Sequence, residues 1–280
     1  MTDDPNAFRR MMRAAQAQPG GVAPLGSWIM SNSPIVAEAM GHAGFAWSVV
    51  DMEHSPIDLA SLVGLLQAVA GTPMVPVTRV PWNDTVLIKR VLDAGVTTLL
   101  VPFVQNADEA CAAVAATRYP PEGVRGMAAM SRGSRFGTAP DYLKRANQGI
   151  SVIVQLESPE AVAQLEAIAA VPGVDGLFIG PADLSAAMGH VGQLTHPEVQ
   201  AVVADAVKRA HAAGRWIGTV GGTAAVVRDY RAMGFDFVAV ASDLGLLMRT
   251  ATGLVAELAP AVASTSASAP AAAPAAPQGY

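Results

Sequence analysis

The sequence predicts an α/β fold, a single (β/α)8 TIM barrel, on three observations. Eight short apolar runs alternate with segments of helical periodicity. The runs are rich in Val, Ile, Leu or Phe and hardly alternate with polar residues, as in parallel strands buried on both faces. The third observation is size: 280 residues, 51% of them hydrophobic, suffice to enclose such a barrel in one domain.

The eight expected strands follow one another along the chain at 26–30, 46–51, 74–79, 97–102, 151–157, 176–180, 216–220 and 237–241. Helical patterns separate them. In Leu59–Val69, for example, the apolar residues Leu59, Leu62, Val63, Leu66 and Val69 fall on one helical face. A last helix over Asp243–Leu258 completes the count that a closed barrel needs.

Glycines precede alternate strands. Gly44, Gly95, Gly173 and Gly234 stand before the second, fourth, sixth and eighth strands, where we expect each to end a helix. A doubly wound open sheet is the alternative fold. It is disfavoured because no Gly-x-Gly-x-x-Gly opens a helix after a strand.

We divide the chain into an N-terminal helical extension (1–20), the barrel (21–259) and a disordered tail (260–280) of Ala, Pro, Ser and Thr. The charged first segment is no signal peptide, and no apolar stretch reaches the roughly 20 residues of a membrane helix. With one cysteine, Cys111, no internal disulfide can form, so we expect a cytoplasmic protein. Cys111 itself is expected to pack as a small hydrophobe.

The charge balance excludes one class of partner. The formal net charge is −5 and no basic stripe could neutralise phosphates, so we expect no nucleic-acid binding.

Polar side chains gather where a TIM barrel carries its active site, at the carboxyl ends of the strands. They are Asp51, Glu53 and His54 after the second strand, Arg79 after the third, Gln155 and Glu157 on the fifth, and Asp183 after the sixth. Trp28 on the first strand and Val220 at the end of the seventh are expected to line the substrate pocket. Val220 ends its strand on the rim, and Gly221 and Gly222 beside it add no bulk, so we expect a roomy opening there.

Glu157 and Asp183 are the candidate metal ligands. They end neighbouring strands, so both carboxylates can reach one ion. Two carboxylates leave about four of six octahedral positions for water and a chelating substrate, which suits Mg²⁺, Mn²⁺ or Co²⁺. The structural alternative is that Glu157 pairs with an arginine and that Asp183 only caps the next helix.

Ala182 and Asp183 begin a helix whose first N–H groups have no partner within it. Such a helix end binds an anion, and we expect the carboxylate of a 2-oxo acid there. Arg79 would face the keto oxygen, where negative charge grows as an enolate forms. The alternative for Arg79 is a structural ion pair with Asp51 or Glu53.

His54 is the candidate base, because it alone among five histidines directly follows an expected strand. A neighbouring carboxylate would fix its tautomer and raise its basicity. A purely structural histidine is the alternative.

The three lysines, Lys89, Lys144 and Lys208, all fall in helical segments. A Schiff-base aldolase needs a buried lysine at the barrel mouth. Stabilisation of the enolate must therefore come from a metal.

Five ordered motifs resemble the HpcH/HpaI family of class II pyruvate aldolases. They are FAWSVVDMEH at 45–54, RVPWND at 79–84, RYPPEGVRG at 118–126, VQLE at 154–157 and GPADL at 180–184, within a resemblance that spans about 26–258.

The resemblance implies His54 as base, Arg79 on the keto oxygen, Glu157 and Asp183 as metal ligands, and Gln155 in the pyruvate pocket. Asp51 and Asp93 match positions that support the histidine. The resemblance also implies a homohexamer, a trimer of dimers that exchange the last helix. The substrates would be pyruvate or another 2-oxo acid and an aldehyde, such as succinic semialdehyde or a sugar-acid aldehyde.

Two positions depart from the family pattern: Met52 stands where relatives often have glycine, and 219–223 is a smaller segment than in the heptanedioate enzymes. We therefore expect a metal-dependent aldolase that cleaves 4-hydroxy-2-oxo acids. A 2-dehydro-3-deoxy sugar-acid aldolase or an oxaloacetate decarboxylase with the same enolate site is the alternative. A non-catalytic scaffold is disfavoured, because drift would not spare His54, Arg79, Glu157 and Asp183 together.

Overall fold

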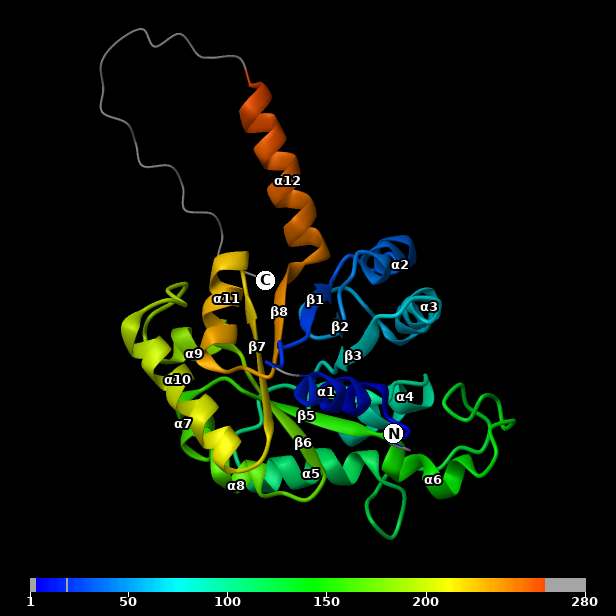
Figure 1. Cartoon of the computed structure of the whole chain (residues 1–280). Coiled ribbons are helices and arrows are strands. Elements are labelled where there is room, and N and C mark those ends of the chain that lie inside the picture. Colours follow the sequence, from blue (N-terminus) through cyan, green and yellow to red (C-terminus); the bar gives the residue numbers. More distant parts are fainter. Residues whose placement is uncertain (1–3, 19, 260–280) are drawn as a thin grey trace, which may run out of the picture.

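The computed structural model describes residues 4–18 and 20–259, and its strands form one closed parallel barrel in chain order (Figure 1). The strands are β1 (Leu25–Ile29), β2 (Trp47–Asp51), β3 (Val75–Arg79), β4 (Thr98–Val101), β5 (Ser151–Leu156), β6 (Val174–Ile179), β7 (Trp216–Gly221) and β8 (Phe237–Ser242). β1 pairs with β8 to close the ring. The TIM-barrel prediction is confirmed.

The helices lie around the outside of this barrel, except that the first covers one end of it and the last projects away from it (Figure 1). They are α1 (Ala7–Ala17), α2 (Pro34–His42), α3 (Leu59–Val69), α4 (Thr85–Asp93), α5 (Ala107–Thr117), α6 (Tyr142–Gly149), α7 (Pro159–Ala163), α8 (Leu165–Ala169), α9 (Pro181–Ala187), α10 (Pro197–Ala212), α11 (Ala224–Met233) and α12 (Asp243–Leu258). The helices α3 and α12 have the bounds that the sequence predicts.

Gly44, Gly95 and Gly234 directly follow the ends of α2, α4 and α11, as expected, whereas Gly173 lies in the turn beyond the end of α8. Gly44, Gly95, Gly173 and Gly234 all have left-handed backbone, with φ of 100°, 100°, 102° and 105°. Only glycine adopts this conformation at little cost, so the positions of these turns can be predicted from the sequence.

Large rings fill the inside of the barrel. The interior cluster includes Trp28, Trp47, Phe178 and Phe237, while a second, larger apolar cluster lies between strands and helices. Small residues make room for the rings: a Cβ on Gly26 would come within 2.2 Å of the Trp47 ring.

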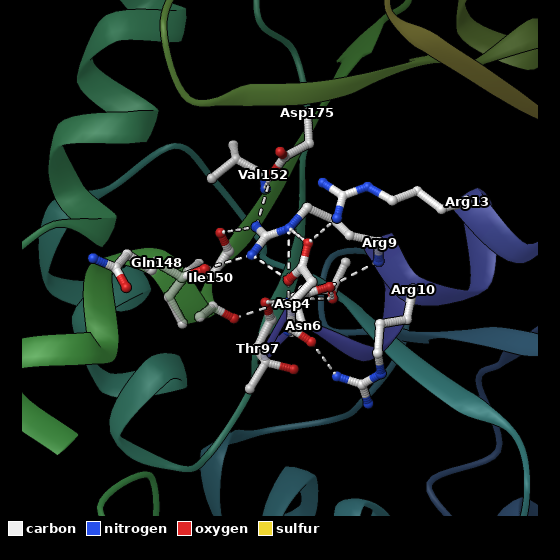
Figure 2. Close-up of polar contacts among 12 residues, drawn as sticks. Asp4, Asn6, Arg9, Arg10, Arg13, Thr97, Gln148, Ile150, Val152 and Asp175 are labelled. Carbon is white, nitrogen blue, oxygen red and sulfur yellow. Dashed lines mark hydrogen bonds and ion pairs between the residues drawn. The ribbon is translucent and has the colours of Figure 1, made fainter. Parts of the chain in front are cut away.

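The helix α1 closes the amino-terminal end of the barrel. Phe8 and Met12 are fully buried in the interior cluster. The Asn6 side chain donates to the carbonyl oxygens of Thr97 (2.7 Å) and Gly149 (3.1 Å), just before β4 and β5 (Figure 2). The segment Ala7–Ala17 is therefore a helix that packs against the interior of the barrel.

Cys111 is exposed, so the expectation that it packs in the core was wrong. The helix α5 buries Ala110, Ala113 and Val114, and Cys111 lies outside that face. The predicted tail, 260–280, lies outside the described residues. Among the residues that the structure describes, no helix is long and apolar enough to cross a membrane.

Replacing Phe8 should test whether α1 supports the barrel. Phe8 packs edge-on against Trp47, Trp216 and Phe237 with ring centroids 5.2–6.5 Å apart. We expect Phe8→Ala to lower the free energy of unfolding by about 3–5 kcal/mol, because it opens a cavity among these rings. Urea denaturation followed by circular dichroism measures the change.

The matched control is Ile35→Ala, since Ile35 is 80% exposed. Its effect should stay within about 0.5 kcal/mol. A Phe8→Ala protein as stable as this control would show that α1 does not support the barrel.

Candidate active site

The residues Asp51 and Arg79 end two adjacent strands in matching register. Arg79 Nε and Nη2 donate to the two carboxylate oxygens of Asp51 at 2.8 and 2.7 Å. Both side chains are essentially inaccessible to solvent, at 0% and 1% exposure. The structural ion pair that the sequence left open for Arg79 is therefore present, and it fixes the plane of the guanidinium.

Glu53 lies at the centre of the charged groups, although the sequence pointed to it only as a possible partner of Arg79 or His54. Its carboxylate is 3.1 Å from Arg79 Nη1 and 3.8 Å from His54 Nε2. Its main-chain N–H donates to Asp51 Oδ1 at 3.1 Å. The one feature of the sequence that pointed to this role of Glu53 is its position between Asp51 and His54.

The ring of His54 stands at the barrel mouth with its side chain 53% exposed. Asp51 holds the main-chain N–H of His54 at 3.4 Å, whereas the ring faces Glu53. The carboxylate beside this imidazole is thus Glu53, and Asp51 supports His54 through the backbone.

The carboxylate of Glu157 is buried just beyond β5, with only 2% of the residue exposed. It accepts hydrogen bonds from the main-chain N–H of Phe103, at 2.8 Å, and from the Gln155 side chain. Phe103 has a left-handed φ of 53°, which is uncommon outside glycine and aims its N–H at the carboxylate. Sequence patterns do not reveal such a main-chain donor.

The end of β6 packs closely against this carboxylate. A Cβ on Gly180 would come within 2.6 Å of Glu157 Oε2 and 2.9 Å of Gln155 Nε2. Glycine at this position therefore lets the start of α9 approach Glu157. Gly180 precedes α9 without a side-chain cap, and Ala182 and Asp183 lie in its first turn.

Three carboxylates influence one another here. Burial raises the pKa of Glu157 to about 7; the Phe103 and Gln155 hydrogen bonds oppose the rise, and the charges of Asp183 and Glu53 add to it. Burial also raises the pKa of Glu53 to about 7, opposed by Arg79 and assisted by Asp51 and Asp183. Glu53, Glu157 and Asp183 thus form one acidic cluster.

A divalent cation fits this cluster. Glu53, Glu157 and Asp183 bring three carboxyl groups together, while Arg79 beside Glu53 is already paired with Asp51. An oxygen-only donor set suits a hard cation such as Mg²⁺ or Mn²⁺. The predicted ligands Glu157 and Asp183 both belong to the cluster.

Trp28 and Val220 face the barrel interior below this cluster. The Trp28 ring lies 5.4 Å from the Arg79 guanidinium carbon. Val220 is 3% exposed and packs in the interior cluster, one residue before β7 ends. Met52 packs against the apolar cluster between strands and helices.

The structure does not join Asp93 to His54. Asp93 ends α4, and its carboxylate accepts a hydrogen bond from Arg125 Nη2 at 2.9 Å. The role that the resemblance implies for Asp93 therefore has no counterpart in the contacts within this chain.

The lysines lie where the sequence predicted, on α4, α6 and α10.

The family model of HpcH/HpaI aldolase/citrate lyase matches residues 25–250, from β1 into α12. The chain belongs to this family. It is a carbon–carbon lyase of the class II pyruvate aldolase type.

Similar proteins include curated sugar-acid aldolases. The chain is 52% identical to 2-dehydro-3,6-dideoxy-6-sulfogluconate aldolase of Pseudomonas putida over 84% of this chain and 92% of that protein. It is 46% identical to 5-keto-4-deoxy-D-glucarate aldolase of Enterobacter sp. (strain 638), over 90% of this chain and 96% of that protein. A crystal structure of an HpcH/HpaI aldolase/citrate lyase family protein from Burkholderia cenocepacia J2315 is 39% identical with a TM-score of 0.85, covering 90% and 99% of the two chains.

The acidic cluster should leave a pH signature in the metal-free aldolase. Because the folded pKa of Glu157 is about 7 against a usual 4.5, the folded state retains a proton that the unfolded chain releases. Stability should therefore fall as pH rises from about 4.5 to 7. We expect Glu157→Gln to reduce this fall, as measured by urea denaturation at several pH values with a chelator present.

The matched control is Glu160→Gln, an exposed glutamate in the first turn of α7. It should leave the pH dependence as in the parent. An equal slope in the parent and in Glu157→Gln would contradict the electrostatic account of the cluster.

Proposed function

We propose that this aldolase uses a divalent metal ion to cleave 2-dehydro-3-deoxy sugar acids reversibly into pyruvate and an acidic hydroxyaldehyde. The observation that carries the proposal is the acidic cluster of Glu53, Glu157 and Asp183 beside Arg79. The substrate class is supported by the similarity to two sugar-acid aldolases.

Glu157 and Asp183 would hold the ion, which we expect to be Mg²⁺, Mn²⁺ or Co²⁺. When bound, such an ion polarises the keto group of the 2-oxo acid and offsets the charge that develops there. The hydrogen bonds from Phe103 and Gln155 orient the Glu157 carboxylate for this task.

Arg79 would stabilise the negative oxygen of the pyruvate enolate. Asp51 holds two of its nitrogens, so the guanidinium cannot turn away when the substrate binds. A preorganised donor of this kind contributes about 2.7–4 kcal/mol to the transition state. The main-chain N–H groups of Ala182 and Asp183 would bind the pyruvate carboxylate.

His54 would move the proton. In the cleavage direction it accepts the proton of the 4-hydroxyl group as the carbon–carbon bond breaks, and then gives it to the methylene carbon of the enolate. In the addition direction it removes a proton from the pyruvate methyl group and gives it to the alkoxide oxygen of the adduct. Its exposed ring can reach substrate from the mouth, and the Glu53 carboxylate lies 3.8 Å from its Nε2.

The aldehyde side of the pocket would be lined by Trp28 and Val220, with open space above Gly222. A Cβ on Gly222 would meet no atom within 4 Å. This space favours a hydroxylated aldehyde over a slim linear one. The names of the two curated relatives describe substrates with a second acid group, a carboxylate in glucarate and a sulfonate in sulfogluconate.

Decarboxylation of oxaloacetate is a second reaction that the same residues support, since it produces the same pyruvate enolate. Release of carbon dioxide would not distinguish the two activities, whereas adduct formation with an aldehyde would.

The helix α12 supports an oligomer. It projects from the barrel (Figure 1) and leaves apolar side chains exposed, among them Leu247 (61%), Val255 (71%) and Leu258 (79%). An exposed apolar surface of this kind indicates a site of protein–protein interaction. A second copy of the chain is the occupant that we propose, within a trimer of dimers that exchange this helix.

The test offers pyruvate with a panel of aldehydes, including glycolaldehyde, succinic semialdehyde and hydroxylated acidic aldehydes, and identifies products by mass. We expect adducts chiefly with the hydroxylated acidic aldehydes. A chelator should abolish them, and Mg²⁺, Mn²⁺ or Co²⁺ should restore them, because the carboxylates are the fixed ligands.

Borohydride added with pyruvate provides the control, since a Schiff-base enzyme would be trapped as a covalent adduct. An adduct on Lys89, Lys144 or Lys208, or activity that survives chelation, would overturn the metal-dependent mechanism. Activity only with succinic semialdehyde would overturn the substrate class.

A further inference from the structure

Two histidines and a glutamate meet on the surface between α9 and α10, outside the active site. His190, His196 and Glu198 each offer a ligand atom, and these atoms lie within 4.8 Å of one another. His190 Nε2 is 2.9 Å from Glu198 Oε2. The two imidazole rings are stacked, with centroids 3.6 Å apart and planes 17° from parallel.

The chain around this cluster is held in place by its own hydrogen bonds. His190 N–H donates to Ser185 at the end of α9 (2.7 Å), and His196 N–H donates to Gln193 (2.9 Å). Glu198 lies in the first turn of α10, and its N–H donates to His196 Nδ1 at 3.3 Å. The three side chains therefore come from a fixed backbone and not from a free loop.

We propose that His190, His196 and Glu198 bind a first-row transition-metal ion such as Zn²⁺ or Co²⁺. Two imidazoles and one carboxylate are ligands that such ions accept, with one position open to water. The hard ion Mg²⁺ prefers oxygen ligands and should not bind here. The Glu198 side chain is 71% exposed and that of His190 20%, so an ion can enter from solvent.

Binding requires a small rearrangement. A metal lies in the plane of the imidazole that ligates it, whereas the two rings are now face to face. They must turn out of the stack so that one nitrogen of each points at the ion. His196 can ligate through Nε2 only as the tautomer that carries its proton on Nδ1, so the hydrogen bond from the Glu198 N–H to Nδ1 must break when the ion binds.

The site is separate from the acidic cluster and is independent of the proposed function. Asp183 lies in the first turn of α9 and His190 follows its last, so α9 separates the two, with a length of about 10 Å at 1.5 Å per residue. An ion there would join the end of α9 to the start of α10. The role of this ion would be structural: it would hold α9 in place, the helix whose first turn contains Asp183.

Equilibrium dialysis of the full-length protein against Co²⁺ tests the stoichiometry. We expect about two ions per chain in the parent, and about one in His190→Ala and in His196→Ala. The matched control is His211→Ala, which removes another surface histidine bonded to a carboxylate, Asp236 at 3.0 Å. It should bind as the parent does.

Glu157→Gln separates this proposal from the proposed function, because it should remove only the ion in the acidic cluster. In that variant, with excess Mg²⁺ present, Zn²⁺ should raise the unfolding temperature, and His190→Ala added to it should abolish the rise. If Glu157→Gln binds no Co²⁺, or if His190→Ala leaves the stoichiometry or the Zn²⁺ effect unchanged, the surface site does not exist.

Discussion

The buried ion pair between Asp51 and Arg79 is the interaction on which the active site depends. The register of β2 and β3 sets the two side chains opposite each other inside the barrel, where neither meets solvent. Loss of one partner would leave an unpaired buried charge, at a cost of about 3–5 kcal/mol. The ion pair positions the Arg79 guanidinium. The guanidinium in turn positions Glu53, whose carboxylate lies 3.1 Å from Arg79 Nη1. Glu53 in turn faces His54, so the geometry of the mouth follows from one contact.

One arginine does not offset the negative charge that the strands bring together. Burial raises the pKa of Glu53 and of Glu157 to about 7, and the charge of Asp183 adds to the rise in both. A bound cation would relieve this excess charge, and Gly180 lets the start of α9 approach the carboxylate of Glu157. Groups with raised pKa values of this kind are common at catalytic sites.

The sequence predicted what depends on local patterns. Local sequence patterns predict the strands, the glycines with positive φ and the helix α12. The order of the strands in the barrel then predicts that Arg79, Glu157 and Asp183 lie on one rim. Contacts between distant segments were not predictable. The docking of Phe8 inside the barrel, the Phe103 N–H on Glu157 and the partnership of Asp93 with Arg125 all depend on tertiary packing. Glu53 was visible in the sequence, but its central place among the carboxylates emerges only when β2, β5 and β6 are assembled.

The central claim is that this rim forms the enolate of pyruvate with His54 as base. Exchange of the pyruvate methyl protons with deuterated water, followed by proton NMR without any aldehyde, measures that step alone. The account predicts metal-dependent exchange in the parent and none in His54→Ala, which should still bind pyruvate because the ligands and Arg79 are intact. Undiminished exchange in His54→Ala, or exchange in the parent that persists after chelation, would contradict it.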